Sequence, residues 1–239
     1  SAMRAAIVIA TLFFELASAL ELGLARRFFA WFQQSAAVSS LHHKHIASET
    51  VVHMLQNTPF AAAPDEMKRD FARGAGGAAV AKFMQLEQQH IGEWKRDRIV
   101  EAAGTEFDAA AARAALVSEV CDQPVVLFSF VDCPWCLLAK EALQSELSLT
   151  SAGTAALRVV ELEDLGRRGK ELRAAIALAT SRTSMPSIWI GGRCVGGYTD
   201  GTPTGDAALC VEAALGLQPL VERGSLRGLL RETGLCFNT

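Results

Sequence analysis

Apolar side chains recur every three or four residues from residue 4 to residue 104. The spacing is clearest in FFELASALELGLARRFFAWF (residues 13–32), ASETVVHMLQ (47–56) and AVAKFMQLEQQHIGEWKRDRIVEAA (79–103), and it is typical of amphipathic α-helices. Pro64, Asp65 and Glu66 suit the first turn of a new helix, because proline φ is already helical and acidic side chains favour that end of the helix dipole. The glycine-rich residues 73–77 indicate a bend. We therefore predict an all-α N-terminal domain of unknown role over residues 1–104.

The period changes after Gly104 and Thr105, where we place the start of a second domain, residues 105–239. Apolar runs at 124–130 and 157–162 indicate strands, and the segments 187–192 and 193–197 indicate a β-hairpin. Helical spacing predicts helices over residues 110–120, 134–146, 169–180, 200–216 and 219–233. Strands that alternate with helices indicate a small α/β fold, and about 110 residues are too few for a doubly wound dinucleotide-binding domain.

The composition excludes several classes of protein. Half of the 239 residues are hydrophobic, which is enough to bury a large core. The formal net charge of −3 and the lack of a basic stripe in the sequence give no reason to expect nucleic-acid binding. Six cysteines with one close pair are too sparse for a disulfide-stapled secreted scaffold. We therefore expect a reducing compartment, either the cytoplasm or the interior of an organelle.

Residues 4–23 have some features of a secretory signal, because they begin with a basic residue, continue apolar and contain Ala-Ser-Ala at 17–19. Glu15 and Glu21 interrupt the apolar run, which stays shorter than the roughly 18 residues of a membrane span. An amphipathic core helix is the favoured interpretation, and an N-terminal targeting remnant is the alternative.

The sequence Cys133-Pro134-Trp135-Cys136 stands where a predicted strand becomes a predicted helix. Pro134 suits the first helical position, which makes Cys133 the N-cap and turns its sulfur toward the unpaired N–H groups of Trp135 and Cys136. These donors and the helix dipole stabilise a thiolate, so the pKa of Cys133 is expected to fall below the usual value of about 8.5. Cys136, one turn further along, is less exposed. We predict that Cys133 is the nucleophile and Cys136 the resolving thiol.

Two other interpretations of this cysteine pair are less favoured. A zinc site usually needs a second cysteine pair or histidines at ligand spacing, and the sequence offers no second pair. A purely structural disulfide that closes so short a loop removes little entropy from the unfolded chain. A redox-active pair is therefore the leading hypothesis. The cluster LHHKH at 41–45 is interpreted as a solvated surface group and not as a metal site, so no metal site is predicted.

Two further motifs sharpen this hypothesis. TSMPSIWIGG places Pro186 directly before a strand and 50 residues after Cys136, and SIWIGGRCVGGYTDG continues into a Gly-Gly turn, a second strand and a second Gly-Gly pair. With the CPWC motif, this order resembles the glutaredoxins of the thioredoxin superfamily, over roughly residues 112–233. The resemblance implies a thioredoxin-like mixed sheet flanked by helices, with a cis proline at Pro186. The N-terminal half is not covered by it.

The resemblance also implies a groove for glutathione. The backbone of Met185 would pair with the cysteine of glutathione, and Thr199 and Asp200, at the start of a helix, would receive its γ-glutamyl end. The positions assigned to glutathione in this way are Arg173, Thr183, Met185, Pro186, Gly197, Thr199 and Asp200. One position departs from the family pattern: Phe130 stands where a lysine is common, so we expect weaker glutathione binding or a less depressed Cys133 pKa than is usual in the family.

The leading interpretation is a glutathione-dependent thiol–disulfide oxidoreductase that reduces protein–glutathione mixed disulfides and protein disulfides. One alternative is a carrier or sensor that holds a [2Fe–2S] cluster through Cys133 and glutathione, and another is a thioredoxin-like disulfide reductase that ignores glutathione. We expect glutathione and proteins with mixed or internal disulfides as partners, with no nucleic acid. The N-terminal helices would dock on the second domain, mediate homo-oligomerisation or bind a partner. Cys210 is expected to lie buried on an apolar helix face.

Overall fold

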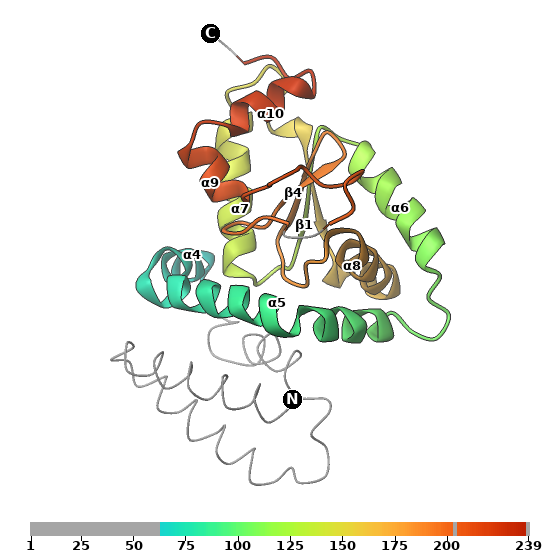
Figure 1. Ribbon diagram of the computed structural model, residues 1–239. Coiled ribbons are helices and arrows are strands. Elements are labelled where there is room, and N and C mark those ends of the chain that lie inside the picture. Colours follow the sequence, from blue (N-terminus) through green and yellow to red (C-terminus); the bar gives the residue numbers. More distant parts are fainter. Residues whose placement is uncertain (1–62, 203–204, 238–239) are drawn as a thin grey trace.

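The computed structural model describes residues 63–202 and 205–237 (Figure 1). The helices predicted before residue 63, the signal-like segment and the histidine cluster at 41–45 lie outside the described residues. Within the described residues, no helix is both long enough and apolar enough to cross a membrane.

A four-stranded mixed sheet forms the centre of the fold, in the order β2-β1-β3-β4. Its strands are β1 (Val125–Ser129), β2 (Leu157–Glu161), β3 (Ser187–Ile190) and β4 (Arg193–Gly196). β1 pairs parallel with β2 and antiparallel with β3, and β3 and β4 form the predicted hairpin. Every residue of β1 is buried, as expected for a central strand covered on both faces.

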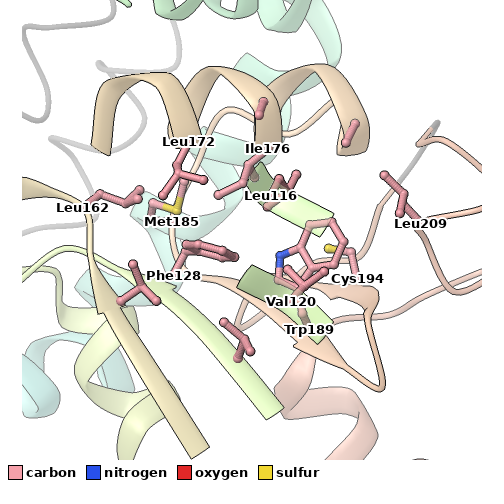
Figure 2. Packing of buried hydrophobic residues seen from close by; sticks show 14 of the residues in the cluster. Leu116, Val120, Phe128, Leu162, Leu172, Ile176, Met185, Trp189, Cys194 and Leu209 are labelled. Atoms are coloured by element: carbon pink, nitrogen blue, oxygen red, sulfur yellow. The ribbon is translucent and has the colours of Figure 1, made fainter. Parts of the chain in front are cut away.

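Helices cover both faces of this sheet (Figure 1). One face packs against α6 (Ala109–Cys121) and α8 (Gly166–Thr180), whose apolar residues surround Phe128 and Trp189 (Figure 2). The opposite face packs against α7 (Pro134–Leu147), α9 (Leu217–Glu222) and α10 (Leu226–Glu232). Two short 3-10 helices, η1 (Gly153–Ala156) and η2 (Glu163–Leu165), flank β2. The small mixed sheet between helical layers confirms the predicted α/β fold.

Two helices precede this sandwich and pack against it. They are α4 (Asp65–Arg73) and α5 (Ala75–Ala102), and Gly74 separates them. Asp65 and Glu66 lie in the first turn of α4 as predicted, whereas Pro64 is its N-cap and not a residue of that turn. In Figure 1, α5 runs along the end of the sandwich at which α7 begins, with α4 beside it. Ile99 and Ala103 share a buried apolar cluster with Ala174 and Ala177 of α8. The described helices thus share a core with the sandwich, and the division of the chain at residue 104 stays a prediction.

The prediction of one helix over residues 200–216 is wrong. This segment is irregular where it is described, and Cys210 forms a parallel β-bridge to Cys194 of β4. Leu209 and Cys210 are therefore buried beside the edge of the sheet and not on a helix face. Gly205 allows this close approach, because a Cβ atom there would stand 2.3 Å from the sulfur of Cys210. The single helix predicted over 219–233 is also divided, into α9 and α10.

Candidate active site

Cys133 is the N-cap of α7, as the sequence predicts. Its sulfur accepts a hydrogen bond from the backbone N–H of Cys136 at 3.3 Å, and Pro134 occupies the first helical position. The side chain of Cys133 is half-buried. A hydrogen bond from the Cys136 thiol lowers the pKa of Cys133, and the backbone N–H groups of Cys136 and Trp135 lower this pKa further. The positive charge of Lys140 acts in the same direction. The thiolate of Cys133 is therefore stabilised by the start of its own helix.

Cys136 has the opposite environment. Its side chain is fully buried beneath Cys133, and this burial, together with the hydrogen bond to Cys133, raises the pKa of the Cys136 thiol well above its usual range. A buried protonated thiol next to a stabilised thiolate gives the two sulfurs different chemical roles. Cys133 is thus the more accessible thiol of the two, and the predicted roles of nucleophile for Cys133 and resolving thiol for Cys136 stay predictions.

The loop before β3 lies beside the nucleophile. The peptide bond between Met185 and Pro186 is cis, and the Cys133 sulfur lies 3.8 Å from the carbonyl oxygen of Met185. The structure thus brings Cys133, Cys136, Met185 and Pro186 together from two segments about 50 residues apart in the sequence. These are the four positions on which the redox hypothesis mainly depends.

Asp200 has an internal partner that the sequence analysis missed. The guanidinium of Arg182 is buried and forms an ion pair with the Asp200 carboxylate. It also donates to the carbonyl oxygen of Gly201 at 2.7 Å and to the hydroxyl of Ser184 at 3.1 Å. Gly197 leaves room for this group, because a Cβ atom at that position would lie 2.2 Å from Arg182 Nη2. Arg182 therefore ties the loop before Pro186 to the Asp200 loop.

The remaining glutathione positions lie around the same loops. Thr199 and Asp200 line a pocket with Met185 and Pro186, but no helix begins at Thr199, so the predicted helix N-terminus at this position is wrong. The assignment of these positions to glutathione stays a prediction.

Arg173 and Thr183 have contacts that the sequence did not indicate. The Arg173 guanidinium lies 5.2 Å from the centre of the Phe130 ring, a cation–π distance. An arginine is therefore held next to the residue that stands where the family commonly has lysine. The hydroxyl of Thr183 donates a hydrogen bond to the side-chain oxygen of Gln88, on α5, at 2.8 Å.

Helices α4 and α5 contribute several more contacts to the site. Lys68 Nζ lies 2.6 Å from Oδ1 of Asp132, the residue before Cys133, and the Phe71 ring meets Trp135 edge to face. Ala81, Met84 and Gln85 of α5 form one wall of the pocket that contains Met185, Pro186, Thr199 and Asp200. No motif in the sequence indicated this, since a helical repeat does not say which loop a helix covers.

The similarity to known proteins covers part of the chain. No family model matches the chain. It is 36% identical over 78 residues to a glutaredoxin of Pseudomonas aeruginosa, and the match covers 32% of this chain and 79% of that protein. The chain belongs to the glutaredoxin family. Glutaredoxins are thiol oxidoreductases, and the redox role of this cysteine pair stays a prediction.

Other glutaredoxins match in the same way. The chain is 37% identical over 81 residues to glutaredoxin-C4, chloroplastic, of Oryza sativa, covering 34% of this chain and 55% of that protein. It is 32% identical over 79 residues to monothiol glutaredoxin-S10 of the same species, and this match covers 33% of this chain and 44% of that protein. The solved structure of holo glutaredoxin C1 from Populus tremula x tremuloides matches with 26% identity and a TM-score of 0.40, covering 53% of this chain and 92% of that chain.

Proposed function

We propose that this glutaredoxin is a glutathione-dependent thiol–disulfide oxidoreductase. The Cys133 thiolate attacks the glutathione sulfur of a mixed disulfide, and the other thiolate leaves and takes up a proton. A second glutathione thiolate then attacks the glutathione sulfur bound to Cys133, which releases glutathione disulfide and regenerates the Cys133 thiolate. With a protein disulfide, the Cys133 thiolate forms a mixed disulfide with the substrate and releases one substrate thiolate. The Cys136 thiolate then attacks the Cys133 sulfur, which releases the second substrate thiolate and leaves a Cys133–Cys136 disulfide. Two glutathione thiols reduce this disulfide and leave as glutathione disulfide.

The observation that carries this proposal is the unequal environment of the two thiols. The sulfur of Cys133 accepts from the backbone N–H of Cys136, and its pKa is lowered, whereas burial raises the pKa of Cys136. A thiolate at the half-buried position and a protonated thiol beneath it suit attack by the first and resolution by the second. The nearby carbonyl of Met185 supports a groove in which a peptide-like thiol adds its backbone beside the sulfur.

The proposed cellular setting is a reducing one, because the cycle uses reduced glutathione. The six cysteines of the chain are all free thiols in the structure, among them the exposed Cys121 and Cys236. Such a set of thiols suits the cytoplasm or the interior of an organelle better than an oxidising compartment.

The iron–sulfur alternative finds less support. A cluster shared through Cys133 would bring a second molecule against the surface around Asp132 and Trp135. Lys68 and Phe71 of the same chain occupy that surface, so the residues around Cys133 do not fit a shared cluster while α4 holds this position. Visible absorption by protein purified without oxygen would favour the alternative.

Serine variants test the proposal directly. We expect Cys133→Ser to abolish reduction of a glutathionylated peptide, because a hydroxyl is not ionised near neutral pH. Cys136→Ser should retain this reaction but lose reduction of a protein disulfide. Full activity of Cys133→Ser would refute the proposal, and reduction of the protein disulfide without any reaction of the glutathionylated peptide would favour the thioredoxin-like alternative.

A further inference from the structure

Three separate contacts hold α4 and α5 over the face that carries Cys133. The ammonium of Lys68, whose side chain is only 3% exposed, pairs with Asp132 directly before the nucleophile. Phe71, three residues later on α4, packs edge to face against Trp135, with the ring centres 6.5 Å apart. The third contact lies on α5, where Gln88 accepts from Thr183 and donates to the carbonyl oxygen of Ser181 at 2.7 Å. The contacts thus lie both beside Cys133 and in the loop before Pro186.

These helices remove from solvent the surface that a large substrate would touch. Trp135, two residues after Cys133, is 6% exposed, and Phe71 of α4 packs against its ring. The pocket beside Met185 and Pro186 is walled by Ala81, Met84 and Gln85 of α5. A folded protein that brings a disulfide to Cys133 therefore meets α4 and α5 before it meets the sandwich.

The loop directly before Cys133 is more exposed. Val131 is 45% exposed, the side chain of Asp132 is 47% exposed, and Cys133 itself is half-buried. We therefore expect a small reagent to reach the sulfur past this short loop more readily than a large one, although Lys68 of α4 contacts Asp132 there. Helices α4 and α5 thus cover the site incompletely, and whether a molecule reaches the Cys133 sulfur depends on the size of that molecule.

We propose that α4 and α5 form a cover that selects the substrates of Cys133 by size. Small disulfides reach the sulfur while the cover is closed, and protein-sized disulfides react only in molecules in which α4 and α5 have moved away. The proposal concerns the substrate class of the glutaredoxin reaction proposed above and rests on it. It adds no chemical step, since each disulfide is attacked by the same Cys133 thiolate and the leaving thiolate takes up a proton.

Alkylation tests the cover without using glutathione. The full-length chain carrying Cys121→Ser and Cys236→Ser, which removes the two exposed thiols, is treated with a small maleimide and with a maleimide on a long polyethylene glycol chain. The readout is the ratio of the large-reagent rate to the small-reagent rate at Cys133, followed by peptide mass spectrometry. If the open state is a minor conformation of 10% or less, this ratio should be at least about tenfold lower than for free cysteine.

Matched variants decide whether the two helices cause the difference. Phe71→Ala with Gln88→Ala removes two of the contacts and should raise the ratio at least about fivefold by populating the open state. Met67→Ala with Gln89→Ala changes exposed residues of the same two helices and should leave the ratio unchanged. Lys68→Met, which removes the ion pair but keeps a long apolar stem, gives a second opening variant if the first folds poorly. Hydrogen exchange in α7 and α8 reports whether the sandwich is intact.

The outcomes separate this inference from the proposed function. The inference of a cover would be wrong if the ratio of alkylation rates in the parent chain with Cys121→Ser and Cys236→Ser equalled that of free cysteine. It would also be wrong if the ratio changed equally in the variants that remove contacts and in the control variant. Turnover of a glutathionylated peptide and of a glutathionylated folded protein is then measured on the same variants. If neither substrate reacts but the alkylation ratio changes as expected, the oxidoreductase proposal fails, and α4 and α5 stand as a steric cover of Cys133 without a role in selecting its substrates. If both react equally fast in the parent, the cover fails and the oxidoreductase proposal stands.

Discussion

At the scale of single residues, the reactivity of Cys133 depends on the pKa of its thiol. The Cys136 thiol and the first N–H groups of α7 lower this pKa. Since the thiolate is the reactive form, a lowered pKa moves the rise of reactivity to lower pH. We expect the rate of alkylation by iodoacetamide to reach half its maximum at a lower pH for Cys133 than for glutathione free in solution. Mass spectrometry of the Cys133 peptide across a pH series measures this.

Variants of Cys136 test what lowers the pKa of the Cys133 thiol. A hydrogen bond from the side chain of Cys136 is the largest influence that lowers the Cys133 pKa. Cys136→Ala, which removes the donor, should therefore move the midpoint upward, and Cys136→Ser, which keeps a donor, should move it less. A midpoint for Cys133 at or above that of free glutathione would show that the N-cap does not activate the thiol.

Phe130 offers a second prediction at this scale. Phe130→Lys would place a cation where the family commonly has one, and should lower the Cys133 pKa or strengthen glutathione binding, because a nearby positive charge favours both anions. Phe130→Leu, an apolar change, controls for loss of the ring that now lies under Arg173. Thiol titration and the KM for glutathione are the measurements. Unchanged values in Phe130→Lys would contradict this prediction.

At the scale of elements, the start of α8 depends on one glycine. A Cβ atom on Gly169 would stand 1.9 Å from the carbonyl oxygen of Leu162, which belongs to the backbone and cannot move away easily. Gly169→Ala should therefore lower the free energy of unfolding by about 1–3 kcal/mol. Gly228 on α10 has nothing within 4 Å of such a position, so Gly228→Ala should be neutral or stabilising by up to about 1 kcal/mol. Urea denaturation measures both, and equal effects would contradict the argument.

The elements also show what the sequence could and could not predict. Local signals were sufficient for α7 and its cap, since Pro134 and the cysteine spacing act within a single turn. They failed over residues 200–216, because Leu209 and Cys210 are buried through a bridge to β4 that no local period can indicate. The cover was missed for the same reason. Lys68 and Asp132 are 64 positions apart, and Gln88 and Thr183 are 95 apart, so these contacts exist only once the chain has folded.

At the scale of the whole molecule, the described N-terminal helices support the sandwich as well as covering its site. Ile99 and Ala103 pack on Ala174 and Ala177 of α8. A chain that begins at residue 105 would lose the stabilisation that comes from burying the Ile99 side chain, about 2 kcal/mol of the free energy of unfolding. Its Tm should therefore fall by on the order of 5 °C. Calorimetry measures this, and an unchanged Tm would show that the sandwich does not depend on α5. Solution mass of the same variant tests whether residues 1–104 mediate homo-oligomerisation.

The far end of the molecule offers a different use. Thr150 forms a β-bridge with Phe237, and the N–H of Ser151 donates to the carbonyl oxygen of Cys236 at 2.8 Å. These contacts lie just beyond the last turn of α7, whereas Cys133 is the N-cap before its first turn. A helix of this length spans about 20 Å. A fluorophore, bead or affinity handle joined after Phe237 would therefore lie far from the sulfur of Cys133. Tethered in this way, the enzyme should turn over a small disulfide as fast as it does when free.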